Sequence, residues 1–478
     1  MIAGLDVGTS AVKALITDAE GRIVARGQAS HPTHRPGPGR VEQDPDDWWR
    51  GAAEALAQCG AARNRVKILA VTGQMQDLIC PGRPAILYSD TRAVTEHDQA
   101  LTLLPDEWPL VADNAPDVTS LPGKLLWLRQ TQPAVLAAAE VLLMGAAGHL
   151  VRRATGIAAC DLTTATTTGL LDACRRTWWE PAVTLLGLDG LLPPLVDGHT
   201  VTGELRTRDL GLPTGIPVVL APGDAAATTL GVVGADTGRA YAYLGTSGWL
   251  AVVTDRPDRP EATHRLALPR PGHTLLIGAM LNAGSAADWA RAAFLPGADP
   301  AAADTLAARC GPSGLIALPS LAGERYPVRD PDARGVLIGI TPSTTPAQMY
   351  RAMLEGVAHV FGALLDALPV AEGPLPVCGG GAASTLWSQI MADVTGRPII
   401  AVDAAFSAAF GAASCGLRAV TGVPLPDLAT TSPGTPVEPG PDAPAYAPLH
   451  QVHRRLHAAL APTFAALAHS SRGGTPCA

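Results

Sequence analysis

Aromatic and charged side chains are scarce in this 478-residue chain, at 4% and 16% of the residues. Hydrophobic residues make up 47%, which excludes global disorder. Basic residues (35) are fewer than acidic ones (43), so the net charge is −8. A protein that coats nucleic acid or anionic lipid normally has the opposite balance. Lysine occurs only at positions 13, 67 and 124.

Long apolar runs and paired cysteines are missing as well. The longest apolar runs are the length of a strand, about ten residues, whereas a helix needs roughly 20 to span a bilayer. The opening MIAGLDVGTS has neither the basic region nor the cleavage site of a secretory signal. The eight cysteines show no C-x-x-C spacing, which excludes a zinc ribbon or a redox motif. We therefore expect a cytoplasmic protein with reduced thiols that binds neither nucleic acid nor membrane.

The order of the expected elements is typical of an α/β protein with more than one domain. Three strands separated by turns fill the first thirty residues, and a helix capped by Asp44 with Pro45 at its first position follows. Further strands are expected at 66–74 and 216–222, the second of them followed by a helix at 225–233. A strand, a glycine loop, a helix and a strand follow over 375–402, and then a helix over 407–422. We expect the proline-rich stretch 421–448 to be irregular and a final amphipathic helix near 449–469.

Two segments far apart in the chain resemble each other. Residues 6–18, DVGTSAVKALITD, match residues 243–255, YLGTSGWLAVVTD, at a constant offset of 237 and without a gap. Two unrelated glycine turns would be the plain alternative. An ancient duplication explains the flanking matches better, and it predicts two related α/β domains that begin with the same strand–turn–strand unit. Asp6 and Lys13 occur only in the first copy.

The first hairpin has the residue types of a phosphate site. Gly8 lets the backbone approach an oxyanion, the Thr9 hydroxyl can donate to it, and Lys13 adds a positive charge. Asp6 could hold Mg²⁺ directly or through water. An ordinary hairpin with a capping aspartate remains the structural alternative. No Walker P-loop pattern occurs in the chain.

Other polar residues follow expected strands, where α/β sheets build their active sites. Asp224 closes the strand before its helix and could abstract a hydroxyl proton, or it could simply cap the helix. Asp90 and Arg92 could bind polyol hydroxyls or form a structural ion pair. The glycines at 379–381 allow close approach of a ligand to the backbone, or only a tight turn.

Together these residues resemble the FGGY family of carbohydrate kinases over essentially the full length. The segments that match, in the family's order, are DVGTSAVK, VEQDPDDWW, VTGQM, SDTRA, KLLWLR, GDAAATTLG, LGTSG, LPSLAGERYPVRDPDARG and GGGAASTLWSQIMADVTG. The second signature of the family fits closely at residues 335–340 and 348–355. The first fits only from Lys124 to Leu128. The resemblance implies two actin-like, ribonuclease-H-like domains flanking a deep catalytic cleft, with residues 1–235 binding the sugar and residues 236–478 binding ATP.

The resemblance also implies a role for each matching residue. Asp224 would be the catalytic base, and Asp6 would hold Mg²⁺ near the phosphates of ATP. The phosphate chain would meet Gly8, Thr9, Lys13, Gly245 and Thr246, and the adenosine would meet Gly380, Gly381 and Ala382. The sugar would be lined by Met75, Gln76, Asp90, Arg92 and Asp224. The expected partners are ATP and a small sugar, and the candidate assembly is a homodimer.

The chain is most similar to xylulokinases within this family, with two departures. Gln76 stands where xylulokinases usually carry histidine, and Ala225 stands where they usually carry asparagine. D-Xylulose is the favoured substrate, and gluconate, ribulose or another ketose or polyol are the alternatives. Two hypotheses from other functional classes remain, a non-sugar ATPase of the same superfamily and a catalytically silent sugar-binding regulator.

Overall fold

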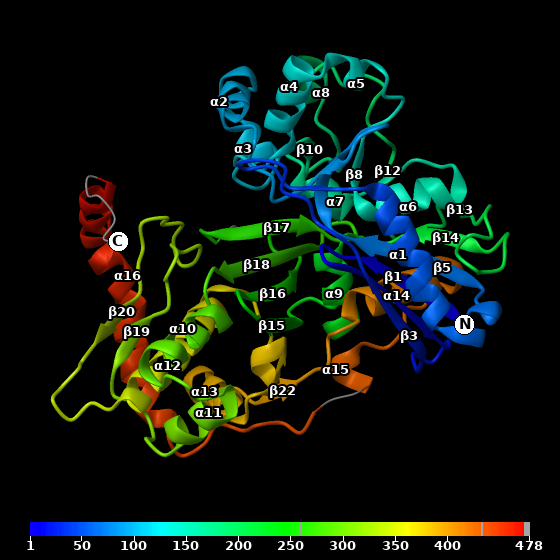
Figure 1. The fold of residues 1–478 in the computed structure, drawn as a ribbon. Helices are drawn as coiled ribbons and strands as arrows, with labels where there is room; N and C mark the ends of the chain where they lie inside the picture. Colours follow the sequence, from blue (N-terminus) through cyan, green and yellow to red (C-terminus); the bar gives the residue numbers. More distant parts are fainter. Residues whose placement is uncertain (259, 432–433, 473–478) are drawn as a thin grey trace. The chain divides into compact units, whose positions relative to one another are not determined.

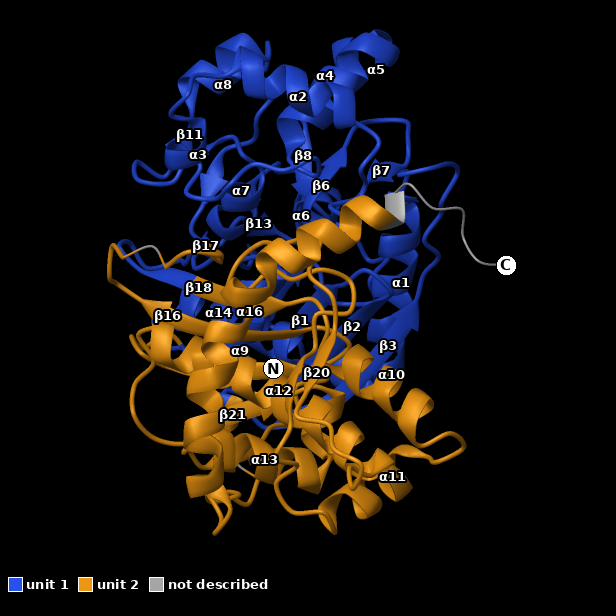
Figure 2. Ribbon diagram, turned by 90° about the vertical axis from the view of Figure 1, so that its left-hand side faces the viewer, with its two compact units in different colours: residues 1–234, 265–275, 406–427 blue, residues 235–264, 276–405, 428–478 orange. Residues whose placement is uncertain are grey.

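The computed structural model describes all residues except 259, 432–433 and 473–478, and it divides into two compact units (Figure 2). Unit 1 comprises Met1–Gly234, Arg265–Leu275 and Phe406–Asp427, and unit 2 comprises Ala235–His264, Leu276–Ala405 and Leu428–Ala478. Among the described residues, no helix is long and apolar enough to cross a membrane. The seven cysteines in the described ranges are free thiols, and Cys477 lies outside them.

The main sheet of unit 1 has six strands in the order β13-β14-β5-β1-β2-β3 (Figure 1). Their bounds are β1 Ile2–Val7, β2 Ala11–Thr17, β3 Ile23–Ser30, β5 Ile68–Gly73, β13 Gly203–Glu204 and β14 Pro217–Leu220. β1 runs antiparallel to β2 and parallel to β5, and β5 runs parallel to β14. The carboxyl ends of three parallel strands therefore lie at one edge of this sheet.

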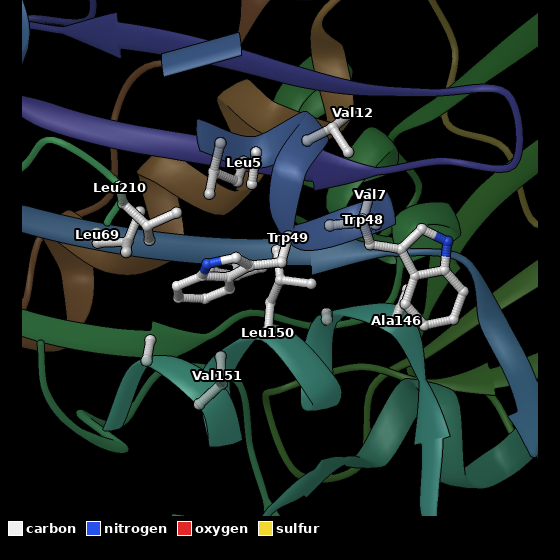
Figure 3. Close-up of a cluster of buried hydrophobic side chains, with 14 of the residues drawn as sticks. Leu5, Val7, Val12, Trp48, Trp49, Leu69, Ala146, Leu150, Val151 and Leu210 are labelled. Carbon is white, nitrogen blue, oxygen red and sulfur yellow. The ribbon is translucent and has the colours of Figure 1, made fainter. Parts of the chain in front are cut away.

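Helix α1, Pro45–Gln58, covers one face of that sheet. The side chain of Asp44 accepts a hydrogen bond from the backbone N–H of Asp46, so the expected cap is confirmed. Trp48 and Trp49 are buried, and Figure 3 shows them between the strands and helix α6, Ala146–Thr155. Burying a large aromatic side chain contributes roughly 2–3 kcal/mol of hydrophobic free energy. The WW pair of the sequence therefore anchors the helix to the sheet.

The remaining elements of unit 1 form a second layer of small sheets and helices with its own apolar core. A four-stranded sheet has the order β4-β7-β6-β8, with bounds Glu42–Gln43, Ala85–Ile86, Met75–Ile79 and Leu143–Gly145. The helices are α2 Val94–Leu103, α3 Trp108–Val111, α4 Leu121–Thr131, α5 Pro133–Ala137, α7 Leu162–Thr167 and α8 Glu180–Leu185, whereas η1 Gly60–Arg65 packs with α1 and β3 of the main sheet. Short strands pair as β9–β12 (Cys160–Asp161 with Leu195–Val196) and β10–β11 (Leu171–Asp172 with Thr177–Trp178).

The second six-stranded sheet, most of whose residues belong to unit 2, has the strand order β17-β18-β16-β15-β21-β22. Its strands are β15 Ala240–Leu244, β16 Gly248–Thr254, β17 Thr263–Ala267, β18 Thr274–Met280, β21 Leu375–Cys378 and β22 Ile399–Ala401. The other elements are α10 Gly284–Phe294, α11 Pro300–Ala308, β19 Ile316–Leu318, β20 Val336–Ile338, α12 Pro346–Ala367, η2 Gly380–Ala383, α13 Thr385–Thr395, α15 Leu428–Thr431 and α16 Ala443–Arg472. Helix α12 is the centre of the apolar core of this unit.

The two main sheets repeat one topology, as the duplication predicts. The order β3-β2-β1-β5-β14 corresponds to β18-β16-β15-β21-β22, with an antiparallel hairpin followed by two parallel pairs in each. The turn of the second hairpin is one residue shorter than the turn of the first. Val7 pairs with Val12 in the first copy, whereas Leu244 pairs with Gly248 in the second. The gapless sequence match therefore hides a shorter turn in the second hairpin.

Two segments of the second half of the chain belong to unit 1 instead of unit 2. One is Arg265–Leu275, and the other contains helix α14, Ser407–Thr421. Helix α14 packs against helix α9, Asp224–Val233, through glycines. A Cβ at Gly411 would lie 1.8 Å from the carbonyl oxygen of Ala227. The expected split at residue 235 therefore describes the linear order of the chain, and the division into sugar-binding and ATP-binding domains stays a prediction.

The final helix is longer than the sequence indicated. We expected irregular structure over 421–448, yet α16 begins at Ala443, and α15 forms within the proline-rich stretch. Pro444 falls in the first turn of α16, where proline is tolerated, but Pro448 and Pro462 lie further along the helix and do not end it. Proline content alone was therefore a poor guide to this segment.

Four histidines from α12 and α16 gather in unit 2. Nδ1 of His359 lies 3.2 Å from Nδ1 of His450, and the ring of His359 also lies against that of His453. The fourth member, His457, is buried beside them on α16. Burial, followed by the nearby His453 and His450, lowers the pKa of His359 to about 2. Burial, followed by His450, lowers the pKa of His453 to about 4.

We predict that this cluster makes the fold sensitive to acid. In the unfolded chain histidine titrates near pH 6.5, so the stability that a neutral buried histidine contributes is present above that pH and is lost as the pH falls below it. Replacing His359 by glutamine should reduce the loss of unfolding free energy between pH 8 and pH 5 by about 2 kcal/mol. Urea unfolding at the two pH values measures it. The control is His469→Gln, on an exposed part of α16. Identical pH dependence in wild type and His359→Gln would contradict the prediction.

Candidate active site

Asp6 and the first hairpin lie at the carboxyl edge of the unit 1 sheet. Asp6 is the fifth residue of β1, and it pairs across the hairpin with Lys13. The backbone N–H of Gly8 donates to the carbonyl of Ala11 over 3.1 Å, which closes the turn. The Cα of Gly8 is close to the Asp6 carboxylate, since a Cβ there would lie 3.9 Å from its Oδ2. The glycine therefore leaves room beside this carboxylate.

Asp224 lies at the same edge, at the first residue of α9. The loop before it is fixed by two hydrogen bonds. The N–H of Gly223 donates to Oδ1 of Asp161 over 2.9 Å, and the hydroxyl of Thr72 donates to the carbonyl of Pro222 over 2.6 Å. Asp161 is itself oriented by the N–H of Thr164 at the start of α7. The position of the Asp224 backbone thus depends on β5 and α7 as well as on its own strand.

The two carboxyl groups share one electrostatic environment. Burial raises the pKa of Asp6 to about 6, and the nearby Lys13 opposes this shift. Burial and then the charge of Asp6 raise the pKa of Asp224 to about 7. Such a carboxylate can accept a proton near neutral pH and release it again. Perturbed carboxyl pairs of this kind are typical of catalytic sites.

Asp6 also has the free acceptor that a metal site needs. Its Oδ1 is buried and accepts no hydrogen bond from any described residue. In the described ranges, no group of three or more histidine, cysteine or acidic side chains is arranged to hold a metal ion. Mg²⁺ is commonly held by one or two carboxylates together with water and substrate phosphates. The residues present therefore fit a Mg²⁺ ion that a nucleotide brings with it.

Met75 and Gln76 lie beside Asp224 at the start of β6. A Cβ on Gly223 would be only 2.2 Å from the Met75 sulfur, so a larger residue next to the aspartate would have to displace the Met75 side chain. Gln76 has a positive φ of 63°. Its side-chain amide donates to the carbonyl and hydroxyl oxygens of Thr119 over 3.1 and 3.3 Å. The side-chain oxygen of Gln76 accepts no hydrogen bond from the residues that the structure describes.

Asp90 and Arg92 form the ion pair that was the structural alternative. Their side chains are 0% and 3% exposed, and Arg92 donates to both carboxylate oxygens of Asp90. Asp90 also accepts from the N–H of Val41, and Arg92 also binds Glu42 and lies over the ring of Trp127. With these partners the pair already satisfies much of its own hydrogen-bonding capacity. Their contact with a sugar stays a prediction.

Sequence reasoning missed Asp77 and left Lys124 without a role. Both side chains are fully buried, and Oδ2 of Asp77 accepts no hydrogen bond from the described residues. Burial raises the pKa of Asp77 well above its usual value, with Lys124 opposing the shift. Burial lowers the pKa of Lys124 to about 8. The sequence signal for this buried pair was Lys124, the lone lysine of an apolar helix, because a buried ammonium needs an acceptor. The ammonium of Lys124 donates to the carbonyl of Leu87.

The second hairpin lies in unit 2. A Cβ on Gly245 would lie 2.4 Å from the Tyr243 ring, which stacks on Trp249 with 3.9 Å between ring centroids. The Gly245 and Thr246 carbonyls accept hydrogen bonds from Gly284 and from Ser285 at the start of α10. An aromatic stack thus occupies the part of this copy where Asp6 and its neighbours lie in the first.

The glycine loop of unit 2 forms the short helix η2. Gly379 has a φ of +96°, and a Cβ there would lie 2.6 Å from the carbonyl oxygen of Leu244. A Cβ on Gly381 would meet the Leu244 side chain at 2.5 Å, whereas Gly380 has nothing within 4 Å. Gly379 and Gly381 therefore lie directly against the end of β15, and Gly380 and Ala382 belong to the same short helix, in the same unit as Gly245 and Thr246.

Comparison with known proteins gives matches along nearly the whole chain. The FGGY family of carbohydrate kinases matches through its N-terminal domain over residues 1–231 and its C-terminal domain over residues 240–420. A xylulose kinase of Escherichia coli strain K12 is 33% identical, covering 97% of this chain and 100% of that protein. The crystal structure of a xylulose kinase from Rhodospirillum rubrum matches with a TM-score of 0.87 at 28% identity, covering 97% of this chain and 99% of that one. A gluconate kinase structure from Lactobacillus acidophilus has the same fold at 24% identity, with a TM-score of 0.87, and covers 98% and 99% of the two chains.

We predict that the carboxyl pair costs stability at alkaline pH. A raised carboxyl pKa stabilises the folded state at low pH, and this contribution is lost as the pH rises through the folded pKa, here about 6 to 7. Asp224→Asn should therefore gain unfolding free energy relative to wild type between pH 5.5 and pH 8.5. Urea unfolding without nucleotide measures the difference. The exposed Asp209→Asn variant serves as the control and should follow wild type. Parallel pH curves for wild type and Asp224→Asn would show that the pair does not interact as described.

Proposed function

Because this chain belongs to the FGGY family of carbohydrate kinases, we propose that it transfers the γ-phosphoryl group of MgATP to a hydroxyl of D-xylulose, which yields D-xylulose 5-phosphate and ADP. The observation that carries the proposal is the pair Asp6 and Asp224. One of its members has a pKa suited to a base, and the other has an unpaired oxygen suited to a metal. Phosphoryl transfer needs positioning, charge neutralisation and a base more than covalent chemistry.

Asp224 has the role of general base. Its carboxylate accepts the proton of the sugar hydroxyl as the hydroxyl oxygen attacks the γ-phosphorus, and the bond from that phosphorus to the β–γ bridging oxygen breaks. Asp161 and Thr72 hold the loop before Asp224, so its carboxylate is in place before the sugar arrives. The proton can pass to solvent after the product leaves.

Asp6 has the role of holding Mg²⁺ with the phosphates of ATP. When bound there, Mg²⁺ would neutralise charge on the phosphates and on the transferring group. The turn at Gly8 and Thr9 contacts the phosphate chain together with Lys13, and Gly245 and Thr246 of unit 2 contact it from the second hairpin. Gly380, Gly381 and Ala382 border the adenosine.

D-Xylulose is the substrate that the relatives favour, since several relatives that match most of the chain are named as xylulose kinases. Met75 and Gln76, next to Asp224, line the sugar site, and the free carbonyl oxygen of Gln76 accepts from a sugar hydroxyl. Gln76 and Ala225 replace the histidine and asparagine usual in xylulokinases. A smaller set of hydrogen-bonding groups lowers selectivity, so gluconate, ribulose or another ketose is the alternative substrate.

We predict that Asp224→Asn lowers the rate of sugar phosphorylation by about 10²–10⁴-fold, because the attacking hydroxyl loses its base. ATP binding should remain within about threefold of wild type, since Asp224 faces the sugar. Single-turnover kinetics and equilibrium binding of ATP measure the two effects, with Asp209→Asn as the control. A variant that keeps a near-wild-type rate would remove Asp224 from the base role.

The metal assignment predicts a difference between the two hairpins. Asp6→Ala should raise the Mg²⁺ concentration needed for half-maximal activity by about tenfold or more, because the ion loses its carboxylate. Tyr243→Ala, at the matching position of the second hairpin, should leave that concentration unchanged even if it lowers activity. Titrations of Mg²⁺ at saturating ATP measure both. Equal metal dependence in wild type and Asp6→Ala would refute the assignment.

The substrate assignment predicts that restoring the usual pair improves recognition. Gln76→His combined with Ala225→Asn should raise kcat/KM for D-xylulose about tenfold and change the value for glycerol little. Histidine is among the residues that tolerate the positive φ of position 76. The assay compares D-xylulose, D-ribulose, L-ribulose, gluconate and glycerol. If D-xylulose ranks far below another sugar in wild type, the substrate assignment is wrong although the chain remains a sugar kinase.

A further inference from the structure

The side chain of Gln43 lies at the centre of a buried hydrogen-bond network in unit 1. It is fully buried in the two-residue strand β4, directly before α1. Its amide nitrogen donates to the carbonyl of Thr9 and to the hydroxyl of Thr33, both over 2.7 Å. Its amide oxygen accepts from the indole N–H of Trp48 over 2.8 Å and from the side-chain amide of Gln74 over 2.9 Å. Both hydrogens and both acceptor positions of the amide are therefore used.

The bond to Thr9 sets the orientation of the turn in the first hairpin. In a trans peptide the carbonyl of one residue and the N–H of the next point in opposite directions. Gln43 holds the Thr9 carbonyl, and Nε2 of His31 lies 3.0 Å from the Gly8 carbonyl. With both carbonyls held, the N–H groups of Thr9 and Ser10 point away from them. Neither N–H donates to an acceptor among the described residues, so both remain available to an anion.

The amide oxygen of Gln43 connects the hairpin to the segment of unit 1 that we propose lines the sugar site. Gln74 directly follows β5, and its own N–H donates to the carbonyl of Val7. The next two residues are Met75 and Gln76. Trp48 ties the network to α1, which packs on the sheet through its buried indole ring (Figure 3). One side chain thus connects the phosphate hairpin, the main helix of the sheet and the start of β6.

We propose that Gln43 is a positioning residue for the reaction. Gln43 directs the free N–H groups of Thr9 and Ser10 toward the phosphates of ATP, and it fixes their position relative to the segment that carries Met75 and Gln76. The proposal rests on the proposed function for the role of this hairpin. Gln43 itself touches neither substrate. It acts through the Thr9 carbonyl on one side and the Gln74 amide on the other.

The geometry provides a variant that breaks only one side of the network. Gln43→Glu keeps an acceptor for Trp48 and for Gln74, and it replaces the donor to Thr9 by a second oxygen. Two oxygens would then face each other at hydrogen-bond distance, which repels the Thr9 carbonyl and turns its peptide. Gln43→Met has the same length without charge, and it removes the bonds on both sides. The two variants therefore separate the phosphate side from the sugar side.

Equilibrium binding of an ATP analogue and steady-state kinetics test the proposal. Gln43→Glu should weaken binding of the analogue and raise the KM for ATP at least tenfold, while the KM for the sugar changes less than threefold. Gln43→Met should raise both KM values. The control is Gln58→Glu, because Gln58 is an exposed amide on α1 that bonds only to the backbone of Gln28. A residue that only stabilised the fold would lower the melting temperature without separating the two KM values.

The outcomes distinguish this inference from the proposed function. If wild type binds no ATP analogue, the proposed function itself fails. If wild type binds the analogue and folded Gln43→Glu binds it equally well, the positioning role is wrong while the kinase assignment stands. Should Gln43→Glu not fold, Gln43→Met carries the test, and unchanged KM values for ATP and sugar in that variant overturn the proposal.

Discussion

The burial of two carboxyl groups at one edge of a sheet is the constraint on which the site in unit 1 depends. Asp6 lies in β1 and Asp224 follows β14; burial raises the pKa of both, and the charge of Asp6 adds to the shift of Asp224. Two such groups stay together only if the backbone around each is held by other bonds. Asp161 and Thr72 hold the loop before Asp224, and Gln43 with His31 holds the turn after Asp6. The polar network around the sheet edge thus holds two carboxyl groups where burial disfavours their charged forms, and a cation bound beside them would favour those forms.

The duplicated sheets show how one framework was specialised. Both units keep the hairpin followed by two parallel strands, yet the first hairpin carries a carboxylate and the second an aromatic stack of Tyr243 and Trp249. The glycines of the two turns have different surroundings. A Cβ on Gly245 would lie 2.4 Å from the ring of Tyr243, whereas a Cβ on Gly8 would make only ordinary contacts, 3.4 Å or more from its neighbours. In our proposal, the same strand order therefore serves metal binding in one unit and only phosphate contact in the other.

Much of the fold followed from the sequence because its signals are local. The structure has the cap at Asp44, the strand and helix that meet at Asp224, and the repeated hairpin. Each of these features is encoded within about fifteen residues. The residues that the sequence did not reveal act over long separations. The role of Gln43 can be recognised only once residues 9, 33, 48 and 74 are seen to contact its side chain. The role of Asp161 can be recognised only once the N–H of Gly223 is seen to donate to its carboxylate. Asp90 and Arg92 show the reverse case, since their spacing fitted sugar recognition and an internal ion pair equally well. The placement of α14 in unit 1 likewise depends on contacts between distant glycines that no local pattern encodes.

The central claim is that this carboxyl pair serves transfer of a phosphoryl group to a sugar. The most direct measurement follows the label from ATP carrying a labelled γ-phosphorus, in the presence and absence of D-xylulose and Mg²⁺. The account predicts that with both present the label appears in a sugar phosphate, in equal amount to the ADP formed, and that without the sugar ATP stays largely intact. Label that ends only in inorganic phosphate, at a rate indifferent to D-xylulose and to every other sugar offered, would contradict it.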